Sequence, residues 1–291
     1  MIRYEGRHFK RLARTGRLES LGEGSMLCEI FHENSKLTPL SAPAARAEIA
    51  LFDRAAGKMQ VQRSPRKVHS LADAVELPDT GPPESGLEQA IADRRSARTF
   101  SGEAITQREL ARLMRYSYGV TQPRLGYRAV ASGGALYPLE LYAVVWKVEG
   151  LKPAVYHYDP SFHRLDVVAR GDFLPSLSRC LWLDGVDAEG AALVLVITAF
   201  FVRSTIKYRE RGYRMILMEA GEVAQNLSLL AAAMGLATCA LGGFLDNELS
   251  GLLGADGFAE AALLPMIVGR GRQEAAPEAD RPGEPGEERM T

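Results

Sequence analysis

A lysine and a tyrosine stand next to each other, at Lys207 and Tyr208, within a strongly basic stretch of the chain. Four arginines surround the pair in the sequence, at Arg203, Arg209, Arg211 and Arg214. Because neighbouring positive charge disfavours an ammonium ion, a lysine in this setting loses its proton more readily and can act as a general base. A solvated basic loop is the alternative interpretation of the same residues.

A second basic run could bind a phosphate group. The run is Arg94-Arg95-Ser96-Ala97-Arg98, and it stands where a predicted helix ends. Three guanidinium groups, which present fixed forks of donors, and one hydroxyl can together chelate phosphate oxygens. The alternative is a solvated helix end whose arginines complement the helix dipole.

Two glycine-rich segments could bring the backbone close to a flat ligand. The first contains Ser132, Gly133 and Gly134, and the second is Leu241-Gly242-Gly243-Phe244. Glycine has no side chain, so backbone groups can approach a ligand there, and Ser132 adds a hydroxyl. An ordinary loop and a Gly-Gly turn are the alternatives.

The elements that would position these residues form an α+β domain. Capping-box spacing predicts helices that begin at Ser85 and at Thr106, the second ending at Gly119 as a C′ glycine. Further helices are predicted over 213–234 and over 246–253, with Asp246 as N-cap, and strands over 141–148, 154–158, 165–168, 193–201 and 263–268. The helix over 213–234 is apolar nearly all round, so we expect it to be buried in a core or across a subunit interface.

Three parts divide the chain. Residues 1–84 form an N-terminal extension, residues 85–272 form the domain, and the Pro-, Gly- and Glu-rich residues 273–291 are expected to be a disordered tail. One patch of the extension stands out, Phe31-His32-Glu33-Asn34-Ser35-Lys36-Leu37. The early basic residues are either a solvated face or a docking surface for an acidic peptide or carrier.

Composition excludes several classes of protein. The net charge of −1 does not favour a nucleic-acid-binding surface, and the odd, widely spaced Cys28, Cys180 and Cys239 predict neither disulfides nor a zinc site. The histidines lack metal-binding spacing, so no metal is expected, and there is no glycine fingerprint for a Rossmann site or a P-loop. The longest apolar run, 191–202, is shorter than the roughly 20 residues that span a bilayer, and no export signal begins the sequence. We therefore expect a cytoplasmic protein without a membrane segment.

Taken in order, the segments resemble the nitroreductase-like flavoproteins, specifically the SagB/ThcOx-type azoline dehydrogenases. The resemblance covers roughly residues 85 to 270, with a further match at Phe31-His32-Glu33-Asn34-Ser35-Lys36. It is carried by the Arg94–Arg98 run, Ser132 to Tyr142, Val155 to Pro160, Lys207-Tyr208, Tyr213-Arg214, Glu219-Ala220-Gly221, Gln225-Asn226-Leu227, Gly235-Leu236 and Gly242-Gly243-Phe244. One departure is Ala131 before Ser132-Gly133-Gly134, where the family more usually has Pro-Ser-Ala-Gly-type sequences.

The resemblance implies a nitroreductase-like α+β fold, with a central, mainly antiparallel sheet flanked by helices, and a homodimer with FMN at the interface. It implies that Lys207 and Tyr208 are the catalytic pair. The residues that match the family's FMN contacts are Arg94, Arg95, Ser96, Arg98, Ser132, Gly133, Gly134, Gln225, Gly242, Gly243 and, competing for one further phosphate contact, Arg270 and Arg272.

The implied reaction oxidises a thiazoline or oxazoline ring to a thiazole or oxazole. The substrate is a ribosomal peptide or a carrier-bound nonribosomal peptide, and the implied partners are a cyclodehydratase or a synthetase complex. Two alternatives stay open at this point: an NAD(P)H-dependent nitro- or quinone reductase, and a flavin-binding scaffold subunit of a peptide-modifying complex.

Overall fold

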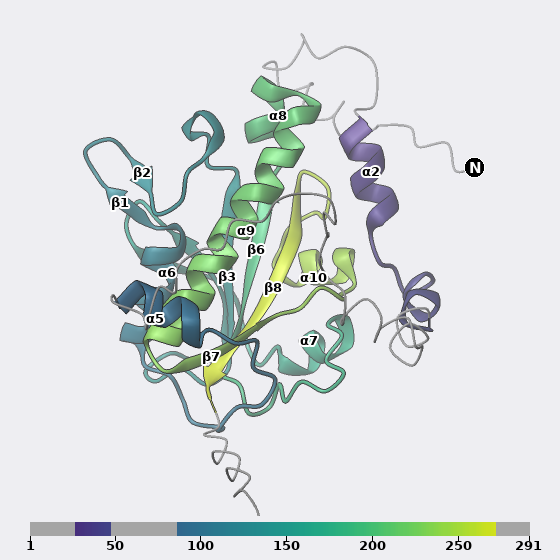
Figure 1. Ribbon diagram of the computed structural model, residues 1–291. Helices are drawn as coiled ribbons and strands as arrows, with labels where there is room; N and C mark the ends of the chain where they lie inside the picture. The colour runs from purple at the N-terminus through teal and green to yellow at the C-terminus, as the bar shows by residue number, and fades with distance from the viewer. Residues whose placement is uncertain (1–26, 48–85, 272–291) are drawn as a thin grey trace, which may run out of the picture.

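The computed structural model describes residues 27–47 and 86–271 (Figure 1). Six antiparallel strands form the central sheet in the order β5-β4-β3-β6-β8-β7. The strands are β3 (Leu139–Val145), β4 (Ala154–Asp159), β5 (Arg164–Arg170), β6 (Leu193–Phe200), β7 (Leu236–Ala240) and β8 (Glu260–Arg270), and β1 (Val120–Gln122) with β2 (Tyr127–Arg128) forms a separate small ribbon. The helices are α2 (Leu27–Ser35), α5 (Gly86–Asp93), α6 (Gln107–Tyr118), α7 (Leu174–Cys180), α8 (Val202–Tyr208), α9 (Glu210–Ala233) and α10 (Asp246–Leu252), with a 3-10 turn η1 at Gly133–Ala135.

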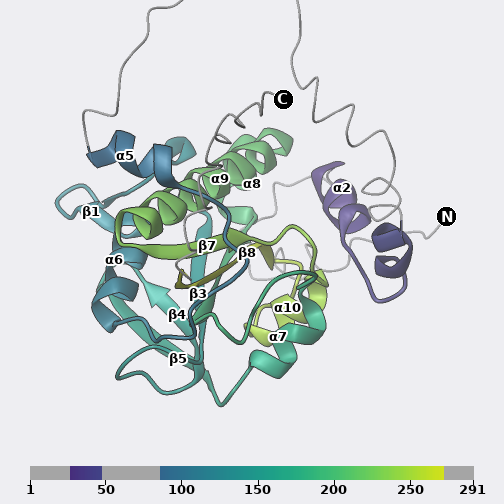
Figure 2. The same cartoon turned by 60° about the horizontal axis from the view of Figure 1, so that its bottom comes forward.

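Helices cover both faces of this sheet, so its middle strands are buried on both sides (Figure 2). Alternate residues of a strand point to opposite faces. Leu141 and Leu195 pack with α6 and α9, whereas Val144 and Val196 pack with α7 and α10. This layering confirms the predicted α+β class with a central antiparallel sheet.

Most of the predicted elements are present. The capping box of α6 is complete, because Thr106 Oγ1 accepts from the Glu109 backbone N–H at 3.1 Å and Glu109 accepts in return from the Thr106 N–H at 2.7 Å. The strand predicted over 141–148 is shifted, since β3 runs from Leu139 to Val145. Val148 lies beyond it in an isolated bridge with Ile105.

Two predicted helix ends are wrong in detail. Gly119 follows α6 with φ −69° and ψ 166°, so it does not adopt the left-handed C′ conformation. Its glycine is required by crowding instead, because a Cβ there would lie 2.6 Å from Arg115 O and from Tyr158 Oη. Asp246 does not cap α10. Its carboxylate accepts from the Leu37 backbone N–H at 2.9 Å, and Leu245 precedes the helix without a side-chain cap.

The basic stretch around Lys207 is helical, not a loop. Residues Val202–Tyr208 form α8, which lies at the N-terminal end of the long helix α9 (Figure 1). A Cβ on Gly212 would lie 2.9 Å from the backbone of Ser204, so the two helices cross in close backbone contact. Within the described residues no helix is long and apolar enough to cross a membrane.

Several expectations fall on residues outside the described ranges. They are the capping residue Ser85, the early basic residues of the extension, the side chain of Cys28, Arg272 and the tail over 273–291. Part of the extension is described, however. Helix α2 contacts α9 from the outside of the domain, which composition alone did not indicate (Figure 1).

Candidate functional site

Gly134 brings the first glycine-rich segment against the Lys207-Tyr208 pair. A Cβ on Gly134 would lie 2.7 Å from Tyr208 Oη and 2.8 Å from Lys207 Nζ. A Cβ on Gly133 would lie 3.7 Å from the Tyr208 ring and 3.0 Å from Met215 Sδ. Two motifs more than 70 positions apart in the sequence thus lie against each other, and any side chain at Gly134 would displace the two polar groups.

The last turn of α8 presents the lysine and the tyrosine. Lys207 Nζ lies 5.0 Å from the centroid of the Tyr208 ring, which is within the range of a cation–π contact. Arg209 follows with φ 51° and separates α8 from α9. This sharp turn leaves both side chains at the tip of the helical pair.

A buried carboxylate holds the Ser132 segment. Glu219 of α9 is 3% exposed and accepts hydrogen bonds from Ser132 Oγ at 2.6 Å and from Tyr118 Oη at 2.8 Å. Ser132 Oγ in turn accepts from the Tyr137 backbone N–H at 2.9 Å. Burial raises the pKa of Glu219, and the two donated hydrogen bonds oppose that rise.

Backbone strain gathers at the same place. Among the described non-glycine residues, four have positive φ, and three of them, Ala135, Tyr137 and Arg209, lie in or beside the two motifs. Such conformations cost of order 1–3 kcal/mol each and persist only where surrounding contacts fix them. Contacts with the surrounding structure therefore hold the backbone here in conformations that these residues do not prefer locally.

An ion-pair network fixes the other end of α8. Arg203 donates to the Tyr137 carbonyl at 3.2 Å and pairs with the buried Glu140 at 2.5 Å. Glu140 also binds His157 Nε2 at 2.9 Å. Burial opposes ionisation of Glu140, but hydrogen bonds from His157 and Arg203 hold the pKa of Glu140 below its usual value, and the bond to Glu140 raises the pKa of His157. Arg203 lies one helical turn before Lys207, so the network fixes the base of the helix that carries it.

The predicted phosphate-binding run lies along the edge strand β7. Ser96 bridges Thr238, and the Ala97 backbone N–H donates to the Thr238 carbonyl at 3.0 Å. Arg95 donates to the carbonyls of Ala92 and Arg94 at 2.8 Å, as expected of an arginine at a helix end. Within the described residues, neither Arg94 nor Arg98 pairs with a carboxylate, so both guanidinium groups are available to an anion.

The remaining predicted contacts have more varied surroundings. Arg270 Nη2 is 3.2 Å from Glu109 and its Nε is 3.5 Å from Glu103, so carboxylates already neutralise it. Gln225 is exposed on α9, and a Cβ on Gly242 would meet open space. Gly243 packs directly against Trp182, because a Cβ there would lie 2.3 Å from the indole ring, which explains its lack of a side chain without a ligand.

The predicted site residues lie in two separate groups within one chain. Gly133 contacts Met215 near the start of α9, whereas the Arg94–Arg98 run lies beside β7, which follows the end of α9 (Figure 1). From Met215 to the last residue of the helix, Ala233, is about 27 Å at 1.5 Å per residue. The structure therefore does not bring Arg94, Ser96 or Arg98 to Lys207 within one copy.

The described residues fit a flavin mononucleotide. The unpaired guanidinium groups of Arg94 and Arg98 suit its phosphate, and the open backbone at Gly242 leaves room for a ring. Thr238, which bridges Ser96, also has a buried hydroxyl with no hydrogen-bond partner in the part of the chain that the structure describes. A buried hydroxyl normally has a partner, so a ligand group beside this run would satisfy it.

The sequence did not predict a positioning role for several residues of the site. Glu219, Glu140, Arg203 and His157 position the motifs, and all four stand in segments that the sequence analysis singled out, but their pairing was not predicted. They act through contacts between segments that are far apart in the sequence. Among the described residues no cluster of histidine, cysteine or acidic residues could hold a metal ion.

Comparisons with known proteins agree with this architecture. The profile of the Nitroreductase family matches residues 91–271. The candidate nitroreductase MJ1384 of Methanocaldococcus jannaschii is 38% identical over 196 residues, which is 67% of this chain and 96% of that protein. The microcin B17-processing protein McbC of Escherichia coli is 33% identical over 168 residues, which is 55% of this chain and 60% of McbC.

One solved structure shares this fold. It is a chain of the E. coli microcin synthetase complex McbBCD with truncated pro-MccB17 bound, with a TM-score of 0.59 and 23% identity. The match covers 86% of this chain and 99% of that chain. The chain is similar to the microcin B17-processing protein McbC, and it belongs to the nitroreductase family.

Proposed function

We propose that this protein is an FMN-dependent dehydrogenase that oxidises thiazoline or oxazoline rings of a peptide to thiazole or oxazole. The observation that carries the proposal is the convergence of Lys207 Nζ and Tyr208 Oη on Gly134. A base and a hydroxyl at one point serve a reaction that removes a ring proton, whereas reduction of a nitro group or quinone requires no such base. The relationship to McbC, a microcin-processing protein, supports a peptide substrate.

The residues divide the chemistry between them. Aromatisation removes a proton from one ring carbon and a hydride from its neighbour, so two electrons leave with the hydride. Lys207 accepts the proton, and Tyr208 donates a hydrogen bond to the ring nitrogen as charge develops there. FMN, when bound, supplies the hydride acceptor. Glu219 and Ser132 hold the backbone beside the reacting ring in place.

Two copies of the chain complete the site. Arg94, Ser96 and Arg98 of one copy hold the phosphate, and Ser132, Gly133 and Gly134 of the other lie beside the ring. The separation of these groups along α9 supports this arrangement. The outer face of α9 also exposes Leu217 (42%) and Met218 (58%), apolar side chains that a second copy would cover.

Substitution of the catalytic pair tests the function. We expect Lys207→Ala to lower azole formation by about 10²–10⁴-fold, because this is the usual cost of removing a general base. Lys207→Arg should fail nearly as badly, since a guanidinium group does not give up its proton at working pH. Both variants should bind FMN as the unmodified protein does. Azole formation by Lys207→Ala near the original rate would show that the base is assigned wrongly.

A second candidate is an NAD(P)H-dependent nitro- or quinone reductase, which the 38% identity to MJ1384 favours. The two functions differ in the direction of electron flow. A reductase consumes NADPH in the presence of a nitroarene, and its rate does not depend on Lys207. An azoline dehydrogenase works without NADPH and with a peptide that a cyclodehydratase or synthetase complex delivers.

A further inference from the structure

Helix α2 packs, through His32, against the start of α8 and the first turn of α9. The imidazole lies edge-on to Phe201 at 4.7 Å and to Tyr213 at 5.9 Å between ring centroids, and Phe201 and Tyr213 stack on each other at 5.7 Å. His32 Nδ1 and Tyr213 Oη form a hydrogen bond of 3.0 Å. Phe201 immediately precedes α8, and Tyr213 lies in the first turn of α9. One histidine therefore contacts both the residue that precedes α8 and the first turn of α9.

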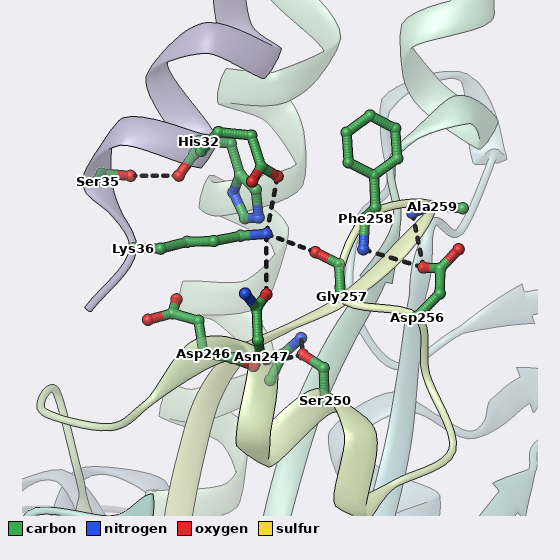
Figure 3. Close-up of polar contacts among 12 residues, drawn as sticks. His32, Ser35, Lys36, Asp246, Asn247, Ser250, Asp256, Gly257, Phe258 and Ala259 are labelled. Carbon is green, nitrogen blue, oxygen red and sulfur yellow. Dashed lines mark hydrogen bonds and ion pairs between the residues drawn. The ribbon is translucent and has the colours of Figure 1, made fainter. Parts of the chain in front are cut away.

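Lys36 anchors the same segment a short distance further on, as Figure 3 shows. Its ammonium group donates to Glu33 at 2.7 Å, to Asn247 Oδ1 at 3.3 Å and to the Gly257 carbonyl at 2.6 Å. The Leu37 backbone N–H donates to Asp246 at 2.9 Å. The Lys36 side chain is only 5% exposed, so its charge-assisted bonds to Glu33 and Gly257 are partly shielded from water, whereas the bond to Asn247 is exposed.

The contacts of His32 and of Lys36 both lead to Phe201. The loop that accepts from Lys36 is organised by Asp256, whose carboxylate accepts from the backbone N–H groups of Phe258 and Ala259 at 2.9 and 2.8 Å (Figure 3). The Ala259 carbonyl then accepts from the Phe201 backbone N–H at 3.4 Å. The segment thus contacts the Phe201 ring through His32 and is linked to the Phe201 backbone through this loop.

We propose that residues 31–37 form a strap that positions the catalytic helix, with His32 as a positioning residue that acts on Lys207 and Tyr208 through Phe201 and Tyr213. The proposal rests on the function proposed above. The strap touches the base of α8, and the pair sits at its tip, one and a half turns away. If the N-terminal end of α8 were held less firmly, the last turn with Lys207 and Tyr208 could move without unfolding of the sheet.

The two nitrogens of His32 allow a matched pair of substitutions. Nδ1 has Tyr213 as its partner, whereas the buried Nε2 has no hydrogen-bond partner among the described residues. An asparagine places its amide near the position of Nδ1, and a glutamine places its amide near that of Nε2. His32→Asn should therefore keep the bond to Tyr213, and His32→Gln should lose it.

His163 offers a control with the same chemistry at a different place. Its Nδ1 bonds to Tyr158 Oη at 2.8 Å, and the two rings meet edge-on at 5.6 Å. This pair lies on the β4–β5 hairpin, away from α8. Substitution of His163 by alanine removes an equivalent histidine–tyrosine pair and leaves the strap intact.

The experiment measures kcat per bound FMN and KM with an azoline peptide, for the full chain and its variants. We expect His32→Ala and His32→Gln to lower kcat by about 10–100-fold with little change in KM, because a misplacement of about 1 Å costs up to that much. His32→Asn, which keeps the bond to Tyr213 but loses the ring contact with Phe201, should lower kcat less than His32→Gln does, and His163→Ala should stay near the original kcat. A kcat for His32→Ala equal to that of the unmodified protein would overturn the proposal.

Hydrogen exchange separates a failure of the strap from a failure of the proposed function, since it needs no substrate. In His32→Ala, the amides of α8 should exchange about 10-fold faster or more, while those of α6 keep their rates. Unchanged exchange in α8 would overturn the strap, whatever the reaction. Lack of azole formation by the unmodified protein, with faster exchange in the variant, would overturn the proposed function and leave the strap standing.

Discussion

Gly134→Ala is the substitution that most directly probes the contact between the two motifs. The added methyl group would lie 2.7 Å from Tyr208 Oη and 2.8 Å from Lys207 Nζ. Ordinary van der Waals contact begins near 3.4 Å, so the ends of both side chains must retreat by at least roughly 0.6–0.7 Å. Both are the far ends of flexible side chains, so they can move without disturbing the fold.

The expected cost is therefore small in stability and large in rate. Gly134 has φ +67°, a conformation that costs an alanine about 1–2 kcal/mol of folding free energy. The displaced base and hydroxyl should lower azole formation by about 10–100-fold, because catalysis is this sensitive to misplacement of about 1 Å. FMN binding should persist, since the predicted phosphate contacts lie in the other group of site residues.

Gly126→Ala is the matched control. Gly126 has φ +71°, but its Cβ would meet open space. Urea unfolding should show a similar loss of stability in both variants, and steady-state azole formation should fall only in Gly134→Ala. If both variants retain full activity at equal stability, Gly134 does not lie against a working catalytic pair.

Three further predictions concern stability and assembly. Thr106→Ala should cost about 1 kcal/mol in urea unfolding with no change in kcat, because the capping bond from the Glu109 N–H is lost. Burial and the charge of Lys36 lower the pKa of His32 to about 4, whereas the pKa of a histidine in the unfolded chain is near 6.5. The free energy of unfolding should therefore fall by up to about 3 kcal/mol as the pH drops from 6.5 to 4. The same dependence of stability on pH in His32→Asn would contradict this assignment. Met218→Lys should give a monomer without flavin in light scattering and absorbance, because it buries a charge in the proposed interface; a flavin-loaded monomer would contradict the shared site.

Local signals predicted the scaffold well. The Thr106–Glu109 capping box and the unbroken apolar run of β6 depend on neighbours in the sequence, and both elements form where those signals indicate. Gly119 shows the limit of such signals. Its position suggested a left-handed cap, but the requirement for glycine comes from crowding by the Arg115 backbone and by Tyr158, and Tyr158 lies 39 residues further along the chain.

The arrangement of the site depends on contacts that no local pattern encodes. Ser132 reaches Glu219 across 87 positions, Arg203 reaches Glu140 across 63, and His32 reaches Tyr213 across 181. A solvated loop was the alternative interpretation of the basic residues around Lys207, whereas the buried Ser204 and Thr205 and the ion pair of Arg203 make this segment a packed helix. The separation of the Arg94–Arg98 run from Lys207 likewise depends on the length of α9.

The mass of an azoline peptide, measured after incubation with the purified protein in air and without NADPH, tests the central claim most directly. A yellow protein should lower the peptide mass by about two mass units per ring, the two hydrogens removed in this chemistry. Lys207→Ala should stay yellow and leave the mass unchanged. An unmodified protein that leaves the azoline peptide unchanged, yet reduces a nitroarene with NADPH at a rate that Lys207→Ala retains, would contradict the proposed function.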